Sequence, residues 1–181
     1  MELKAGDIVT GDDLHGRTEK LDELWDRIQS ASLLLSSPRR FGKTSLIHEM
    51  QQFPRENYKV IYADMEGYSS PEDFIIDFVK HLERSAWGRV KGLFSSLKDE
   101  TSELSIFQVT LKLKQELQNN WQQKGTKIFA EFKNDEKEVI IALDELPLFL
   151  LKIDDQNGND GKAITYFLQW LRDLRQTLKL R

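Results

Sequence analysis

The sequence of 181 residues contains no cysteine, which excludes disulfides, thiolate metal sites and a cysteine nucleophile. Its three histidines, at positions 15, 48 and 81, do not have the spacing of metal ligands. Every apolar run is too short to cross a membrane as a helix, and the first residues lack the apolar core of a signal peptide. We therefore expect a cytoplasmic protein that has no membrane partner.

A large excess of one charge is also missing. Lysine and arginine number 26 and aspartate and glutamate 30, which gives a formal net charge of −4. This balance provides no general attraction to nucleic acid or to an anionic membrane. Hydrophobic residues make up 39% and charged residues 31%, as is typical of a folded globular domain, and the length suits one domain with its own core.

The most informative segment is Ser37-Pro38-Arg39-Arg40-Phe41-Gly42-Lys43-Thr44. It fits the phosphate-binding pattern G-x-x-x-x-G-K-[ST] at every position but the first, where Ser37 replaces glycine. In such a loop, backbone N–H groups surround the phosphates of a nucleotide and the next helix points its positive end at them. Lys43 would then contact the β- and γ-phosphates, and the hydroxyl of Thr44 would bind Mg²⁺. The whole segment and Ser45 are predicted to bind nucleotide; the alternative is an ordinary basic turn.

The sequence around this segment has the strand and helix that such a loop requires. The run Leu33-Leu34-Leu35 predicts a buried strand over 32–36, and the pattern from Ser45 predicts a helix that ends near Gln52, before Pro54. A second strand is predicted over 59–64. Two further helices are expected early in the chain, one capped by Thr18 and one that starts at Ser70-Pro71. An irregular helical insertion is expected over about 85–135, with a polar helix through Leu117 and Trp121, and a loop over 154–161. The last expected helix covers 162–178, and its buried residues are Ile164, Phe167, Leu168, Leu171, Leu174 and Leu178.

A second motif follows the clearest buried strand, the continuous apolar run over 139–143. Asp144-Glu145 comes directly after this run, as in a Walker B element. Because neighbouring parallel strands end at the same edge of a sheet, we expect Asp144 to lie near Thr44 and to hold Mg²⁺ with it. Glu145 would polarise the attacking water as a general base. The alternative is that both acids only cap the next helical turn.

Strands separated by helices predict an α/β fold with a mostly parallel sheet. Four segments carry a family resemblance: Asp12-Asp13-Leu14-His15-Gly16-Arg17, Ser37-Pro38-Arg39-Arg40-Phe41-Gly42-Lys43-Thr44-Ser45-Leu46, Ile61-Tyr62-Ala63-Asp64-Met65-Glu66 and Ile140-Ile141-Ala142-Leu143-Asp144-Glu145. On these segments the chain resembles the archaeal/bacterial ATPase family of the AAA+/STAND superfamily, over most of its length but weakly from about 85 to 135.

The resemblance implies a P-loop NTPase domain over 1–181, built as a three-layer αβα sandwich, with ATP and Mg²⁺ as its ligands. It also implies that Gly16 and Arg17 lie near the adenine pocket; an ordinary turn is the alternative for these two residues. Asp64 and Glu66 are interpreted as solvated loop acids near the site. Arg39 and Arg40 could contact phosphate, solvent or a partner.

The chain departs from that family at its end. Relatives continue into a strand with a polar sensor residue, a further strand and a helical lid, whereas this sequence stops at Arg181. In relatives the sensor strand lies between the strands that carry the two motifs, so we expect a gap, an exposed edge or a rearranged sheet here. The chain is expected to be the N-terminal part of a longer ATPase, and to bind nucleotide but hydrolyse it poorly.

The leading functional prediction is Mg²⁺-dependent ATP binding and hydrolysis by a switch ATPase, with Lys43 and Glu145 as catalytic residues. ATP would control a protein partner or a homo-oligomer. Two alternatives are a nucleotide-dependent DNA-associated protein, for which no DNA-binding motif is seen, and an interaction module with a vestigial ATPase site. A kinase is less favoured because the Asp-Glu pair suits activation of water better than of an acceptor hydroxyl.

Overall fold

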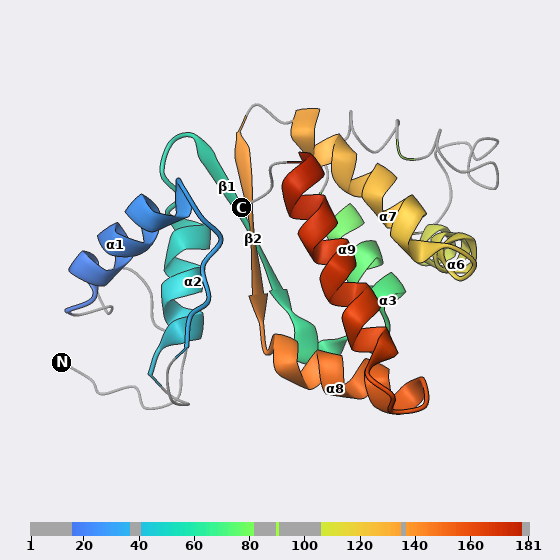
Figure 1. Ribbon diagram of the computed structural model, residues 1–181. Helices are drawn as coiled ribbons and strands as arrows, with labels where there is room; N and C mark the ends of the chain where they lie inside the picture. Colours follow the sequence, from blue (N-terminus) through green and yellow to red (C-terminus); the bar gives the residue numbers. More distant parts are fainter. Residues whose placement is uncertain (1–15, 37–40, 82–89, 91–105, 135–136, 179–181) are drawn as a thin grey trace.

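The computed structural model in Figure 1 describes residues 16–36, 41–81, 90, 106–134 and 137–178. It is a mixed α/β structure around a two-stranded parallel sheet, as far as these residues show. Strand β1 (Tyr58–Asp64) pairs with β2 (Glu138–Asp144), so that Tyr58 lies opposite Glu138 and Asp64 opposite Asp144. Both strands were predicted, β1 from its β-branched and aromatic residues and β2 from its continuous apolar run, and both are confirmed. Parallel pairing brings their carboxyl ends to the same edge of the sheet.

One face of the sheet is covered by two helices, α1 (Thr18–Ile28) and α2 (Lys43–Gln52). Val60 of β1 and Ile140 of β2 pack against this pair of helices. Side chains alternate along a strand, so every second residue of each strand faces α2. This cluster is the smaller of the two cores, and its buried members are Leu24, Trp25, Ile28, Leu46, Met50, Val60 and Ile140.

The opposite face of the sheet is covered by helices (Figure 1) and carries the larger core, which is rich in phenylalanine. Its helices are α3 (Pro71–Val79), α6 (Ile106–Leu117), α7 (Trp121–Ala130), α8 (Leu146–Gln156) and α9 (Lys162–Leu178). Phe74 lies at its centre and stacks on Phe129, with ring centroids 5.8 Å apart, while Phe167 meets Phe74 edge-on at 5.9 Å. Helices on both faces agree with the expected α/β layering; the P-loop sandwich itself stays a prediction.

Several predicted helix boundaries are confirmed. Ser70 caps α3 by accepting a hydrogen bond from the backbone N–H of Asp73 at 3.3 Å, and Pro71 takes the first helical position. Helix α2 ends at Gln52, two residues before Pro54. Helix α9 spans the predicted range. Within the described ranges, no helix combines the length and apolar character that a membrane span requires.

The strand predicted over 32–36 is wrong. These residues form no strand, and Leu34 is 91% exposed. Leu33 and Leu35 nevertheless pack against the smaller core, as their apolar character suggests. A strand requires a neighbour to bond with, and β2, the nearest strand, is separated from the 32–36 segment by a cleft.

Other boundaries also differ from prediction. The single polar helix expected through Leu117 and Trp121 is two helices, because Asn120 caps α7 by accepting from the N–H of Gln123 at 3.2 Å. Residue Arg17, not Thr18, is the cap position of α1.

The predicted loop over 154–161 begins only after Gln156, the last residue of α8. Buried Asp154 then holds the turn by accepting from the N–H of Gly161 at 2.9 Å. On α9, Leu168 is exposed and Trp170 is buried in its place. The expected insertion over 85–135 lies partly outside the described residues; inside them it contains α6 and α7.

Candidate functional site

The two sequence motifs meet at the carboxyl edge of the sheet. Thr44 Oγ1 donates a hydrogen bond of 2.6 Å to Oδ2 of Asp144, although the two residues are 100 positions apart in the sequence. Strand alternation explains the contact: Asp144 points to the same face of β2 as Ile140, which is the face that α2 covers. The expected proximity of Thr44 and Asp144 is therefore observed.

Helix α2 begins directly after a glycine, in a backbone conformation that favours glycine. Gly42 is the cap position of α2 and has φ 73° and ψ 25°, in the left-handed region that favours glycine. Lys43 and Thr44 follow as the first two helical residues, half-buried, and Ser45 is buried beneath them. This geometry directs the N-terminal end of α2, with its positive dipole, toward the end of β2.

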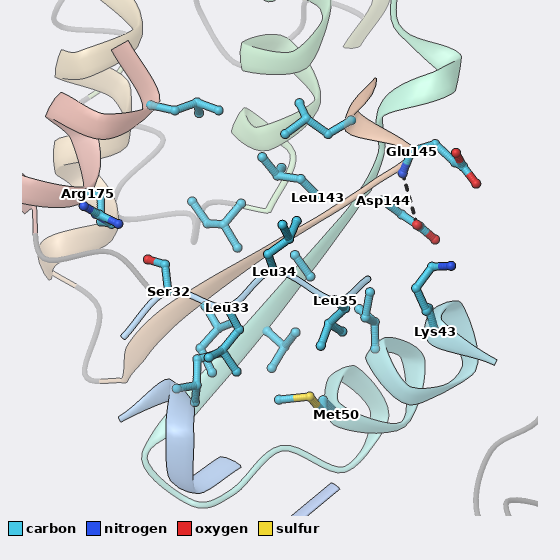
Figure 2. Close-up of a pocket in the computed structure, with 18 of the residues that line it drawn as sticks. Ser32, Leu33, Leu34, Leu35, Lys43, Met50, Leu143, Asp144, Glu145 and Arg175 are labelled. Carbon is cyan, nitrogen blue, oxygen red and sulfur yellow. Dashed lines mark hydrogen bonds between the residues drawn. The ribbon is translucent and has the colours of Figure 1, made fainter. Parts of the chain in front are cut away.

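Glu145 is held in a strained conformation next to this contact. It has φ 49° and ψ 30°, an uncommon conformation for a residue with a side chain, at the point where β2 turns into α8. Its backbone N–H donates to Oδ1 of Asp144 at 3.0 Å. Its own side chain makes no capping hydrogen bond to α8, which argues against the capping alternative for Glu145. Figure 2 shows Lys43, Asp144 and Glu145 gathered at one end of a cleft.

Tyr62 belongs to this site, and the sequence did not reveal it. Its hydroxyl donates to Oδ2 of Asp144 at 3.3 Å, and the ring of His48 lies against its own ring at 4.4 Å between centroids. Burial, reinforced by the negative charge of Asp144, raises the pKa of Tyr62 to about 12. The hydroxyl therefore stays protonated and can donate at neutral pH. The contact depends on the register that places Tyr62 opposite Ala142, which no local sequence pattern shows.

Arg17 is brought to the phosphate-loop segment. Its guanidinium donates to the carbonyl oxygen of Phe41 at 2.9 Å, and it lies beside Gly42. Gly16 precedes it with φ 68°, so the chain turns sharply before α1. Phe41 itself is 56% exposed. The predicted role of Gly16 and Arg17 in base binding stays a prediction, and residues 37–40 of the loop lie outside the described residues.

The donor set at the site suits a hard cation better than a transition metal. In the part of the chain that the structure describes, no three histidine, cysteine, aspartate or glutamate side chains converge as metal ligands. Thr44 and Asp144 offer one hydroxyl and one carboxylate. Mg²⁺ commonly takes one or two carboxylates from a protein and completes its octahedron with water and substrate phosphates. These two residues therefore fit Mg²⁺ that arrives with a nucleotide.

The acids that close β1 lie at the margin of the site. Asp64 and Glu66 are exposed, and Asp64 accepts a hydrogen bond from the N–H of Glu66 at 3.1 Å. That contact caps the short 3-10 turn over Met65–Gly67. Both acids thus match their interpretation as solvated loop residues.

Comparison with protein-family models, with curated proteins and with solved structures found no match to this chain. The resemblance to the ATPase family therefore stays a prediction, which rests on the four sequence segments that carry it. Within the described residues, the site brings together Lys43, Thr44, Asp144 and Glu145.

Proposed function

We propose that the chain binds ATP with Mg²⁺ at the carboxyl edge of its sheet and that this site supports slow hydrolysis, as expected of the N-terminal part of a longer ATPase. The observation that carries the proposal is the contact of 2.6 Å between Thr44 and Asp144, which joins the two sequence motifs beside Lys43. A nucleotide site needs a hydroxyl and a carboxylate close together as ligands for Mg²⁺. An ordinary basic turn has no evident use for this contact.

Each residue has a distinct role in the proposed site. Lys43, at the start of α2, would bind the β- and γ-phosphates together with the positive end of the helix dipole. Thr44 and Asp144 would be the protein ligands of Mg²⁺, which neutralises phosphate charge when bound. Tyr62 would orient Asp144 through its hydrogen bond to Oδ2. Arg17, through its bond to Phe41, would support the phosphate loop from the side of α1.

Glu145 would act as the base. Its position directly after Asp144 places a second carboxylate beside the cation site, and the left-handed backbone fixes the direction in which its side chain leaves the strand. Glu145 would accept a proton from a water molecule as the water oxygen forms its bond to the γ-phosphorus. The bond between that phosphorus and the bridging oxygen would break, and ADP would leave with the electron pair.

The layering of helices on both faces of a parallel sheet supports, as part of this proposal, a P-loop NTPase sandwich of the switch-ATPase type. A cytoplasmic location and a protein partner or homo-oligomer controlled by ATP belong to the same proposal. The nucleotide would act by changing the packing of elements that contact the site, of which α1, α2 and α8 are the nearest.

Calorimetric titration of the chain with ATP and Mg²⁺ tests the proposal. Replacing Lys43 by alanine should weaken ATP binding about 10- to 100-fold, since a charge-assisted hydrogen bond contributes about 1.5–3 kcal/mol. Lys127→Ala is the matched control, because Lys127 is exposed on α7, across the sheet from the site. Equal ATP affinity of Lys43→Ala and the unmodified chain would remove the proposal.

A further inference from the structure

A second cavity, of about 300 Å³, lies among the helices of the larger core. Its walls come from the starts of α3, α7 and α9 and from the end of α8, helices that Figure 1 shows on the side of the sheet away from α1 and α2. Lys43, Thr44, Asp144 and Glu145 do not line it, so this cavity is separate from the proposed nucleotide site.

Glu72 is the only charged residue among those that line the cavity. It is half-buried, and no ion pair or hydrogen bond joins its side chain to another described residue. The other acids of α3 are paired, Asp73 with Lys114 at 2.6 Å and Asp77 with Lys80 at 2.7 Å. Partial burial of an unpaired carboxylate costs free energy unless a donor compensates it. The dipole of α3 also favours an acid at this position, so Glu72 alone does not define a ligand.

Two aromatic side chains from different helices line the same cavity. Trp121, the first residue of α7, is half-buried and is held edge-on by Trp170, with ring centroids 5.0 Å apart. Tyr166 of α9 is 55% exposed. The face of an aromatic ring carries partial negative charge and attracts a cation. Aromatic rings beside a carboxylate therefore favour an organic cation as the ligand.

Amide side chains add hydrogen-bond acceptors. Gln122, Gln156 and Asn157 line the cavity, and the side-chain N–H of Asn157 donates to the carbonyl oxygen of Ile153 at 2.7 Å, which leaves its amide oxygen as an acceptor. Gln156 and Asn157 also lie at the end of α8, where the helix dipole is negative. The cavity thus offers several acceptors to a ligand that is rich in N–H groups.

The starts of α3 and α7 would favour an anion, but each carries a capping side chain. Ser70 accepts from the N–H of Asp73 at 3.3 Å, and Asn120 accepts from the N–H of Gln123 at 3.2 Å. Glu72, in the first turn of α3, would also repel an anion. Among the described residues, no lysine, arginine or histidine lines the cavity. The balance of charge therefore favours a cation.

We propose that this cavity binds a guanidinium group, such as that of arginine. A guanidinium is flat, always charged and carries five N–H donors in one plane. Its face would lie on the ring of Trp121 or Tyr166, and its edge would donate to the carboxylate of Glu72 and to the amide oxygens. An ammonium group suits the cavity less well, because it is strongly hydrated and has no flat face.

Ethylguanidinium tests this without nucleotide, so the outcome does not depend on ATP binding. Indole N–H signals in NMR spectra report on the four tryptophans, and Trp121→Phe and Trp25→Phe assign two of them. We expect the probe to shift the Trp121 signal with a Kd of about 1 mM. The signal of Trp25, on α1 across the sheet, should stay unchanged. N-ethylurea has nearly the same shape without the charge, and ethylammonium has the charge without the plane; both should bind about tenfold more weakly or worse.

Variants of the chain locate the binding. Glu72→Gln should weaken ethylguanidinium about tenfold or more and leave N-ethylurea unchanged, whereas a purely structural Glu72 would affect only stability. Glu19→Gln is its matched control, because Glu19 is an exposed acid in the first turn of α1. Tyr166→Ala should weaken the probe about two- to fivefold. Phe53→Ala is the control for it, since Phe53 is equally exposed, at 56%, at the end of α2.

A blocked glycine–arginine–glycine peptide and free arginine distinguish the two sources of the group. Tighter binding of the peptide would identify an arginine residue of a partner protein, and tighter binding of free arginine a small molecule. Three results would overturn the proposal: no shift of the Trp121 signal by ethylguanidinium at about 20 mM, equal affinity of Glu72→Gln and the unmodified chain, or ethylammonium that binds as tightly as ethylguanidinium.

Discussion

Thr44 donates its hydroxyl to Oδ2 of Asp144 at 2.6 Å, and Tyr62 donates to the same oxygen at 3.3 Å. The third donor, the N–H of Glu145, reaches Oδ1 at 3.0 Å. One carboxylate therefore connects β1, β2 and the first turn of α2. Any ligand that competes for Asp144 changes contacts on three elements at once, which is how the proposed nucleotide-dependent switch would act.

Replacing Asp144 by asparagine should remove the dependence of ATP affinity on Mg²⁺. Asparagine keeps the size of the side chain and can still accept from Thr44, but it lacks the charge that holds a cation. Addition of Mg²⁺ should raise the ATP affinity of the unmodified chain by about 10- to 100-fold more than that of the variant. Titrations with and without Mg²⁺ measure the difference.

Asp64→Asn is the control for this prediction, because Asp64 ends the neighbouring strand directly opposite Asp144. It is exposed and contacts only the backbone of Glu66 among the hydrogen bonds that the described residues show. A response to Mg²⁺ in Asp144→Asn equal to that in Asp64→Asn would show that Asp144 is not a cation ligand.

Replacing Tyr62 by phenylalanine should lower the free energy of unfolding by about 0.5–1.5 kcal/mol at neutral pH, the usual contribution of one hydrogen bond. The raised pKa of Tyr62 adds a pH dependence. The unfolded chain releases this proton near the ordinary tyrosine pKa of about 10, whereas the folded chain retains it to about 12. The buried, protonated hydroxyl thus stabilises the fold below pH 10, and this contribution is lost as the pH rises from 10 through 12.

Urea unfolding of both proteins at several pH values between 8 and about 12 measures this effect; below pH 10 the difference should be constant, as linkage requires. The stability of the unmodified chain should fall more steeply above pH 10 than that of Tyr62→Phe. Tyr58→Phe, on the same strand, controls for loss of a tyrosine. Parallel pH profiles of the unmodified chain and Tyr62→Phe would contradict the raised pKa of Tyr62.

Gly42→Ala should destabilise the chain by about 1–2 kcal/mol, because alanine is strained in the left-handed region that Gly42 occupies. Space is not the limiting factor, since the nearest atom to an added Cβ would be the Arg17 guanidinium at 3.5 Å. Gly67→Ala is the matched control: Gly67 has no positive φ and no atom within 4 Å of an added Cβ. Thermal unfolding of the two variants should separate them; similar melting temperatures would count against strain at Gly42.

The parts that the sequence predicted correctly are those that depend on local pattern. Strand β2 and helix α9 carry continuous or periodic apolar residues, and Ser70-Pro71 carries its own start signal. The 32–36 segment has an equally apolar pattern, but whether it forms a strand depends on a neighbour that is distant in sequence.

The candidate site also contains some contacts that could be predicted from local sequence and others that could not. The contact between Thr44 and Asp144 could be predicted because two motifs implied it. Tyr62 could not, because its contact follows from the pairing register of β1 and β2. The break at Asn120 could have been found, since asparagine before an amphipathic run is a common helix cap. The strain at Glu145 is a property of the strand–helix turn and has no sequence signature.

Glu145→Gly should separate stability from catalysis. Relief of the left-handed conformation stabilises the fold by about 1–2 kcal/mol, and the greater freedom of glycine in the unfolded chain offsets about 0.4–1 kcal/mol of this. The free energy of unfolding of the variant should therefore be about 0.5–1 kcal/mol higher than that of the unmodified chain. The variant should also lose ATP hydrolysis, because its base is gone. Glu145→Gln should lose hydrolysis without gaining stability, since it keeps the strain.

Asn159→Gly, at the other non-glycine residue with positive φ among those described, is the control. It should gain little stability, because asparagine tolerates φ 54°. Urea unfolding and phosphate release measure the two properties. A Glu145→Gly protein that is no more stable than Glu145→Gln would show that the turn carries no strain, and undiminished phosphate release would assign the base elsewhere.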